Sequence, residues 1–205
     1  MILVDHPLVR VHVTSIRDIE ASVDTFRGHL AALARLMAFP VLRDLPTTPV
    51  SVTTPLAAAE GEQLLREPVL VPVMRAGMGL VDGFRDVIPN AIVSHLGMYR
   101  DHATLKPVRY YSNFPENRHA HPFILLDPML ATGGSAADAL DYLKQEGAYD
   151  IRLVSIIAAP EGVRHVESRH PDVKIFTAAL DERLDERGYI IPGLGDAGDR
   201  QFGTL

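Results

Sequence analysis

The chain has no cysteine and no long apolar run among its 205 residues. The lack of cysteine excludes disulfide bonds and metal sites built from thiolates. The first residues, MILVDHPLVRVHV, are apolar, but Asp5, His6 and Arg10 interrupt them and no basic leader precedes them. This pattern predicts neither a signal peptide nor a membrane span, so we expect a cytoplasmic protein.

Positive charge is also in short supply, since 20 lysines and arginines stand against 26 acidic residues and give a formal net charge of −6. This balance disfavours broad electrostatic binding to nucleic acid. A small anionic ligand is still allowed, because a few arginines and backbone N–H groups can dominate the potential within a site. With 47% hydrophobic and 22% charged residues, the composition is that of an ordinary globular protein.

Short apolar segments alternate with helical patterns through most of the chain. We expect strands over 68–73, 91–98, 123–127, 151–158 and 173–180, and helices over 79–88, 135–147 and 160–170. Continuously apolar strands separated by helices predict an α/β fold whose mainly parallel sheet is flanked by helices on both faces. In such sheets ligands bind beyond the carboxyl ends of the strands.

The first third of the chain follows another pattern. Apolar residues at three- and four-residue steps predict a helix over 17–38 that Pro40 stops. The prolines that follow predict a loop or short extended piece over 44–58, and we expect a short helix over 58–66.

Two polar segments stand outside the alternation. Residues 99–121 are expected to form a long flexible loop, because a loop of this length in a compact domain is usually functional or mobile. The acidic stretch LDERLDER, residues 180–187, is expected to be a solvated face or a helical turn. Four histidines have no metal-ligand spacing and are expected to be solvated: His119, His121, His165 and His170.

The stretch ILLDPMLATGGSAADAL, residues 124–140, ends a predicted strand with Asp127 and begins a predicted helix after ATGGS. Residues 131–135 carry little side-chain bulk, so their N–H groups can converge on an anion where the helix dipole favours negative charge. Thr132 and Ser135 add hydroxyl donors. The alternative is a plain turn with a serine cap, but acid, threonine, paired glycines and serine together favour a phosphate site. It is no Walker loop, since GK[ST] is absent.

Glycines mark two further segments. Arg75 follows the strand over 68–73, and we expect Gly77 and Gly79 after it to let the backbone approach a ligand, although a surface arginine beside a helix start is the alternative. The last 18 residues hold five of the fifteen glycines together with apolar residues. This combination predicts an ordered loop that approaches a ligand or another segment closely.

These stretches resemble the ligand-binding segments of type I phosphoribosyltransferases, in the form found in the uracil phosphoribosyltransferase branch. LLDPMLATGGSA is similar to the ribose-phosphate motif, with Pro128 where the wider superfamily has a second acid. PVMRAGMGLVDG resembles the pyrophosphate loop and GYIIPGLGDAGDRQFGT the uracil-binding loop. HPLV, TFR and YRDHATLKPVRYY also fit, so the resemblance spans essentially the whole chain and is weakest over 39–60.

The resemblance implies transfer of the 5-phosphoribosyl group from 5-phosphoribosyl 1-diphosphate (PRPP) to N1 of uracil, giving UMP and diphosphate in pyrimidine salvage. It implies Mg²⁺ bound mainly through the substrate, a homodimer or larger homo-oligomer, and a GTP effector as in some members. It also implies one domain over 1–205. Within it we expect a helical segment over about 14–66, a core over about 67–180 and a C-terminal hood over about 181–205, beside the long flexible loop.

Residue by residue, the resemblance gives catalytic roles to Asp127, Arg75 and Arg100. It implies contacts with PRPP for Arg75, Arg100, Asp127, Pro128, Met129, Leu130, Ala131, Thr132, Gly133, Gly134, Ser135 and Asp196. It implies contacts with uracil for Ile190, Gly195, Asp196 and Ala197. Read without the resemblance, Ile190 could be core and Asp196 a turn residue.

Backbone recognition explains how such a loop would select its base. Main-chain N–H and C=O groups can match the edge of uracil, and they should reject cytosine, whose exchanged donor leaves buried groups unpaired. No residue stands out as a general base for uracil N1.

Three other interpretations stay open from the sequence. A purine or orotate transferase would share the reaction class, but the C-terminal loop argues against it. A non-catalytic regulator that senses nucleotides and binds RNA should carry a basic face, against the charge of −6. A generic α/β scaffold would leave three ligand-type loops unexplained.

Overall fold

The computed structural model describes residues 1–100 and 107–204, without the side chains of residues 97–100, 107–110 and 112. Its strands are β1 (Ile2–Leu3), β2 (Thr47–Thr53), β3 (Ala58–Leu64), β4 (Val69–Pro72), β5 (Ile92–Val93), β6 (Leu96–Arg100), β7 (Pro107–Ser112), β8 (Phe123–Leu126), β9 (Met129–Leu130), β10 (Ile151–Ala158), β11 (Lys174–Leu180), β12 (Arg183–Leu184) and β13 (Ile190–Ile191). Its helices are α1 (Pro7–Arg17), α2 (Val23–Val41), α3 (Met78–Val87), the 3₁₀ turn η1 (Arg118–Ala120), α4 (Gly134–Gln145), α5 (Pro160–Arg169) and α6 (Ala197–Phe202).

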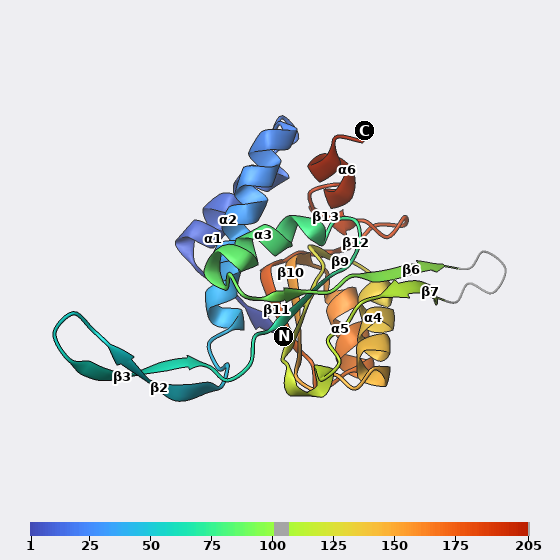
Figure 1. Cartoon of the computed structure of the whole chain (residues 1–205). Helices are drawn as coiled ribbons and strands as arrows, with labels where there is room; N and C mark the ends of the chain where they lie inside the picture. Colours follow the sequence, from blue (N-terminus) through green and yellow to red (C-terminus); the bar gives the residue numbers. More distant parts are fainter. Residues whose placement is uncertain (101–106, 205) are drawn as a thin grey trace.

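The central sheet has the strand order β1-β11-β10-β8-β4-β5, and β9 also pairs with β10 (Figure 1). Every pairing within it is parallel. The carboxyl ends of β4 and β8 therefore lie at the same edge, where ligand sites form in such folds.

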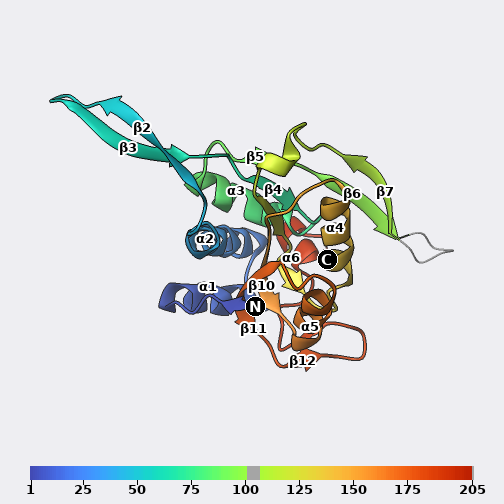
Figure 2. The same cartoon turned by 90° about the horizontal axis from the view of Figure 1, so that it is seen from below.

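Helices cover both faces of this sheet: α1, α2 and α3 lie on one side and α4 and α5 on the other (Figure 2). Alternate residues of one strand serve the two cores. Leu70 of β4 packs with the helices of the first side, whereas Val69 and Val71 pack with those of the second. The predicted α/β fold with a mainly parallel, helix-flanked sheet is confirmed.

The helix expected over 17–38 is confirmed for most of its length as α2 but is wrong at its start, because a break separates α2 from α1, a helix that was not expected. Polar side chains near the break take over backbone donors. The Asp18 carboxylate accepts the Glu20 N–H at 3.0 Å, and Ser22 Oγ caps α2 by accepting the Thr25 N–H at 3.1 Å. Pro40 does not stop α2, which ends one residue later at Val41.

The short helix expected over 58–66 is also wrong. Residues 58–64 form β3, which pairs with β2 in an antiparallel hairpin that projects from the body of the molecule (Figures 1 and 2). Partly buried and exposed positions alternate along β3, which is the period of a strand. Gly61 in its middle disfavours a helix.

The strand expected over 91–98 is divided in two. β5 continues the central sheet, whereas β6 leaves it after a single bridge between Leu96 and Val73 and pairs with β7. The loop expected over 99–121 therefore contains an antiparallel hairpin and the turn η1. The flexibility expected for it falls partly on residues 101–106, which lie outside the described residues.

Most of the acidic stretch 180–187 is exposed, as expected for a solvated face. It contains the short strand β12 instead of a helical turn, and Asp181 is buried with only 9% of its surface exposed. Two histidines expected to be solvated are buried as well. His121 contacts the Glu67 carbonyl at 2.7 Å and His170 the Ala137 carbonyl at 3.1 Å.

Over the described residues, no helix has both the length and the apolar character that a membrane crossing requires.

Candidate active site

The turn between β9 and α4 has the geometry of an anion site. Gly133 adopts φ +80° at the start of α4, and no side chain caps this helix. The Gly134 N–H has only a long contact of 3.5 Å with Thr132 Oγ1. Backbone N–H groups at a helix amino terminus that lack strong partners can donate hydrogen bonds to an anion, which the helix dipole also favours.

Two glycines let helix α5 support this turn from behind. A Cβ on Gly162 of α5 would lie 2.3 Å from the Ala131 carbonyl oxygen, and one on Gly133 would lie 2.8 Å from the Gly162 carbonyl oxygen. Neither position tolerates a side chain without movement of the backbone. The turn is therefore held at a fixed distance from α5.

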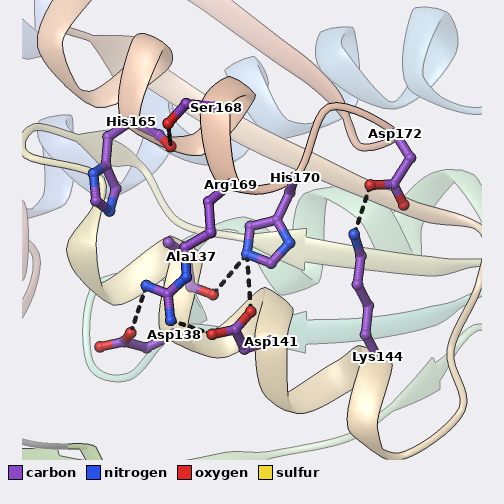
Figure 3. Close-up of polar contacts among 9 residues, drawn as sticks. All are labelled: Ala137, Asp138, Asp141, Lys144, His165, Ser168, Arg169, His170 and Asp172. Carbon is purple, nitrogen blue, oxygen red and sulfur yellow. Dashed lines mark hydrogen bonds and ion pairs between the residues drawn. The ribbon is translucent and has the colours of Figure 1, made fainter.

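Polar contacts hold α4 against α5 along the same side (Figure 3). Arg169 of α5 forms ion pairs with Asp138, at 3.0 Å, and with Asp141. Burial lowers the pKa of His170, so its neutral ring can donate Nε2–H to the Ala137 carbonyl in the first turns of α4. These contacts fix the direction in which the amino end of α4 points.

Asp127 follows β8 and stands beside the turn. Its Oδ1 accepts the Met129 N–H at 3.3 Å, and burial raises the pKa of its carboxyl group to about 6. A largely buried carboxylate with one backbone donor is poorly satisfied, so a ligand that donates hydroxyl groups to it would stabilise the ionised form.

Arg75 lies after β4 and is tied to the carboxyl end of the chain. Its Nη2 pairs with Asp199 of α6 at 3.0 Å, its Nη1 lies 3.4 Å from Thr204 Oγ1, and its guanidinium lies 5.8 Å from the centre of the Phe202 ring. Hydrogen bonds from Thr204 and Arg75 hold the pKa of Asp199 below its usual range. The Arg75 side chain is still 55% exposed and open to an anionic ligand.

The two glycines after Arg75, Gly77 and Gly79, pack closely against other parts of the protein. A Cβ on Gly77 would lie 2.2 Å from the Leu126 carbonyl oxygen, and one on Gly79 would lie 2.6 Å from a methyl group of Leu30. Neither residue lines a cavity described here. Both allow close packing within the protein, and a close approach to a ligand stays a prediction.

Two adjoining cavities lie at this edge of the sheet. The first, of about 320 Å³, is lined by Val73, Met74, Arg75, Ala76, Asp127, Met129, Leu130, Ala131, Thr132, Gly133, Gly134, Ser135, Ala136, Asp196 and Gly198. The second, of about 230 Å³, is lined by Ala76, Met129, Ala131, Gly188, Tyr189, Ile190, Gly195, Asp196, Ala197 and Gly198. Five residues belong to both linings: Ala76, Met129, Ala131, Asp196 and Gly198. The two cavities therefore share a wall.

Most of the residues singled out in the sequence meet at these cavities. Pro128 does not, because it is buried and its carbonyl accepts the N–H groups of Ile156 and Ile157, each at 3.0 Å. The side chain of Arg100 lies outside the described residues. Asp196 lines both cavities and also caps α6 by accepting the Asp199 N–H at 2.9 Å.

Sequence reasoning missed Tyr189, Asp199 and Asp181. Tyr189 lines the second cavity, and its place between Gly188 and Ile190 in the singled-out segment was an available signal. Asp199 pairs with Arg75, which is 124 positions away in the sequence, and no local sequence pattern predicts such a pair. The burial of Asp181 could not be predicted, because the stretch LDERLDER around it has the composition of a solvated surface.

The described residues contain no group of three or more histidine, aspartate or glutamate side chains that could hold a metal ion. Among them, the first cavity offers two carboxylates, Asp127 and Asp196. This donor set suits a hard cation that keeps most of its ligands from water and a bound substrate.

Comparison with known proteins agrees with this arrangement. The family profile described as uracil phosphoribosyltransferase matches residues 3–204. The uracil phosphoribosyltransferases of Bacillus licheniformis and Oceanobacillus iheyensis are 52% and 53% identical to this chain over 201 residues, covering 98% of it and 96% of each relative.

Solved structures show the same fold. The AQ2163 protein from Aquifex aeolicus superposes with a TM-score of 0.90 at 37% identity, over 98% of this chain and 97% of that one. Adenine phosphoribosyltransferase from Leishmania donovani shares the fold at a TM-score of 0.59 and 15% identity, over 91% and 86% of the two chains. From the profile match over nearly its whole length and from relatives more than 50% identical, this chain belongs to the uracil phosphoribosyltransferase family.

Proposed function

We propose that this protein transfers the 5-phosphoribosyl group of PRPP to N1 of uracil, giving UMP and diphosphate in pyrimidine salvage. The observation that carries this proposal is the pair of adjoining cavities, one walled by an anion-binding turn and the other by the glycine-rich C-terminal loop. UMP carries a phosphate and a uracil ring on one ribose. Its phosphate would lie in the first cavity and its ring in the second, which shares a wall with the first.

The first cavity would hold the donor. The N–H groups and hydroxyls of 131–135 would bind the 5′-phosphate, and Asp127 would accept hydrogen bonds from the ribose hydroxyls. Arg75 reaches the same cavity and would bind the diphosphate, a role we also give to Arg100. This grip lies away from the breaking bond and would orient the reacting carbon.

The second cavity would hold uracil. Ile190 is buried within the core and lines this cavity, so it offers an apolar surface to the flat ring. Gly195, Asp196 and Ala197 would present backbone N–H and C=O groups to the edge of the base. A base that reverses one donor would leave a backbone group unpaired, and this is the physical basis for selecting uracil over cytosine.

In the reaction, the bond between ribose C1′ and the diphosphate oxygen breaks and a bond from C1′ to uracil N1 forms. N1 releases its proton, for which we assign no accepting side chain. Positive charge grows on the ribose as negative charge grows on the diphosphate. The Asp127 carboxylate would stabilise the first and Arg75 and Arg100 the second.

Mg²⁺, when bound with the donor, would neutralise part of the charge on the departing diphosphate. Asp127 and Asp196 would contribute to holding it, mainly through water and the hydroxyl groups of the donor. The proposal includes one working domain over 1–205. A cytoplasmic location, a homo-oligomer and a GTP effector stay predictions, of which light scattering and activity with and without GTP would test the last two.

The test is incubation of the folded protein with isotope-labelled uracil, PRPP and Mg²⁺, with parallel reactions on cytosine, adenine and orotate. We expect labelled UMP, and a kcat/KM for cytosine lower by about 10³-fold or more. Failure of well-folded protein to form UMP would refute the proposal. A nucleotide of adenine or orotate in its place would move the protein to another base specificity.

A further inference from the structure

The C-terminal loop that lines the second cavity is held by charged side chains that lie outside this cavity. We define this base loop as residues 190–197. It contains the two-residue strand β13 and otherwise has no regular structure before α6 begins at Ala197. A loop of this kind needs contacts from other elements to keep its backbone groups in one arrangement.

Arg17 and Asp181 form the main contact with the base loop. The guanidinium of Arg17 makes two hydrogen bonds to the Asp181 carboxylate, of 2.8 and 2.5 Å. The same pair holds both backbone groups of Gly193: Arg17 Nη1 donates to its carbonyl at 2.8 Å, and Asp181 Oδ2 accepts its N–H at 2.8 Å. We call Arg17, Asp181 and Gly193 the clamp.

The clamp is largely shielded from water. The Asp181 side chain is 4% exposed and the Arg17 side chain 25% exposed. A charged pair in such surroundings is costly unless its hydrogen bonds are satisfied, and here they are satisfied by the loop backbone. Its geometry is specific because the planar guanidinium fork fits one arrangement of carboxylate and carbonyl.

The position of Gly193 accepts no residue other than glycine without strain. It has φ +62°, and a Cβ added to it would lie 2.1 Å from the Ile190 carbonyl oxygen. The turn from Ile190 to Gly193 is therefore tightly closed, and the clamp fixes its last residue. Residues 195–197, which line the second cavity, follow after Leu194.

Arg200 holds the next residue of the base loop. Its Nη1 donates to the carbonyls of Leu194, at 3.0 Å, and of Ile16, and its Nη2 donates to the carbonyl of Asp18. Its guanidinium also lies 4.7 Å from the centre of the Phe26 ring. The loop is thus joined to the end of α1 at two successive positions.

The clamp residues Arg17 and Asp181 lie outside the second cavity. Arg17 and Arg200 line a third cavity of about 360 Å³, together with Gly195 and Asp196, which also line the second cavity. Neither Arg17 nor Asp181 belongs to the lining of the second cavity. They can influence a bound base only through the loop between them.

We infer that Arg17 and Asp181 are positioning residues for the base: they fix Gly193, and through it the backbone groups of residues 195–197 that would contact uracil. This inference rests on the proposed function. Asp196 of the base loop also lines the first cavity, but the turn between β9 and α4 and Arg75 are fixed by α5 and α6. The clamp should therefore act more strongly on the base than on PRPP.

The test compares two clamp variants, Arg17→Lys and Asp181→Asn, with the control Arg35→Lys. Lysine keeps the charge of Arg17 but loses the fork, and asparagine turns donors toward Arg17. The control alters an ion pair between α2 and α3, Arg35 with Asp86, whose side chains are 49% and 52% exposed. Each variant is measured for uracil KM, PRPP KM, kcat and thermal midpoint.

For both clamp variants we expect the uracil KM to rise about tenfold or more, with a clearly smaller rise in the PRPP KM. The control should leave both KM values unchanged. Equal rises in the two KM values, or an unchanged uracil KM in a folded variant, would overturn the inference. If one clamp variant fails to fold, the other decides the result.

Amide hydrogen exchange of Gly193, whose N–H is bonded to Asp181, separates this inference from the proposed function when it is measured in the ligand-free protein. The clamp variants should exchange this amide about tenfold faster than the wild type and the control, whether or not the wild type forms UMP. Unchanged exchange in the variants would overturn the clamp, even for an enzyme that makes UMP normally. Absence of UMP with faster exchange would refute the function alone.

Discussion

At the scale of single residues, Asp127 illustrates the limit of local reasoning. Its place at the end of a strand can be read in the sequence. Its burial and its raised pKa cannot, because they depend on the packing of residues that follow it and of strand β10. The same holds for Asp181, whose partner Arg17 is 164 positions away in the sequence.

The raised pKa of Asp127 predicts a pH dependence of donor use. Below about pH 6 the carboxyl group of the free enzyme becomes protonated, and it then accepts ribose hydroxyls less well. We expect kcat/KM for PRPP to fall as the pH is lowered through this value. The phosphates of PRPP titrate in the same range, so the comparison is with Asp127→Asn.

That variant should have a lower kcat/KM at pH 7.5 and a flatter profile between pH 5 and 7, retaining only the titration of the donor. A profile of the same shape as that of the wild type, with an unchanged kcat/KM, would remove Asp127 from the mechanism.

Asp127 should also affect stability, with a sign fixed by the direction of its shift. Burial raises its pKa from 3.8 to about 6, so the folded state holds the proton more tightly and loses stability as pH rises through this interval. At pH 7.5 the ionised group is buried at a cost that asparagine avoids. We expect Asp127→Asn to raise the free energy of unfolding by about 1–2 kcal/mol at pH 7.5, allowing for partial exposure, and by less at pH 4.5.

Urea unfolding curves at the two pH values measure this difference. An equal gain in the free energy of unfolding of Asp127→Asn at both pH values, or a loss at pH 7.5, would show that burial of the ionised carboxylate does not destabilise the wild type.

At the scale of elements, hydrophobic periodicity predicted the helices α3, α4 and α5 and the strands β4, β8, β10 and β11. Gly147 also follows α4 in the left-handed conformation expected of a closing glycine. The errors fall where side chains compete for backbone donors or where a strand pairs outside the main sheet. The break between α1 and α2 depends on Asp18 and Ser22. The strands β2 and β3 contain too few apolar residues for their hairpin to be predicted from hydrophobic periodicity.

The packing of α5 against the turn between β9 and α4 gives a prediction at this scale. In Gly162→Ala, the new Cβ would meet the Ala131 carbonyl oxygen at 2.3 Å, so α5 or the turn must move. We expect the PRPP KM to rise about tenfold and stability to fall by about 1–3 kcal/mol, as for other overpacked sites. Steady-state kinetics and thermal unfolding measure both effects.

The matched control is Gly28→Ala in α2, where an added Cβ meets nothing within 4 Å. It should leave the KM unchanged and raise stability by about 0.5–1 kcal/mol, because alanine favours a helix over glycine. A PRPP KM in Gly162→Ala equal to that of the control would show that α5 does not position the turn.

At the scale of the whole molecule, the site depends on segments that are far apart in sequence. Arg75, Thr132 and Ala197 lie around two cavities that share five lining residues. The parallel sheet explains how the first two come together, because the carboxyl ends of β4 and β8 lie at one edge. The third is brought there by the C-terminal segment, whose path follows from tertiary contacts such as the clamp and could not be derived from periodicity.

The measurement that tests the shared site most directly is a crystal structure of the protein with UMP, which carries both the phosphate and the base. We expect the phosphate within hydrogen-bond distance of the backbone N–H groups of 131–135 and the uracil ring against residues 190–197, in a single molecule that spans both cavities. UMP bound with its phosphate or its ring outside these two segments would contradict the account.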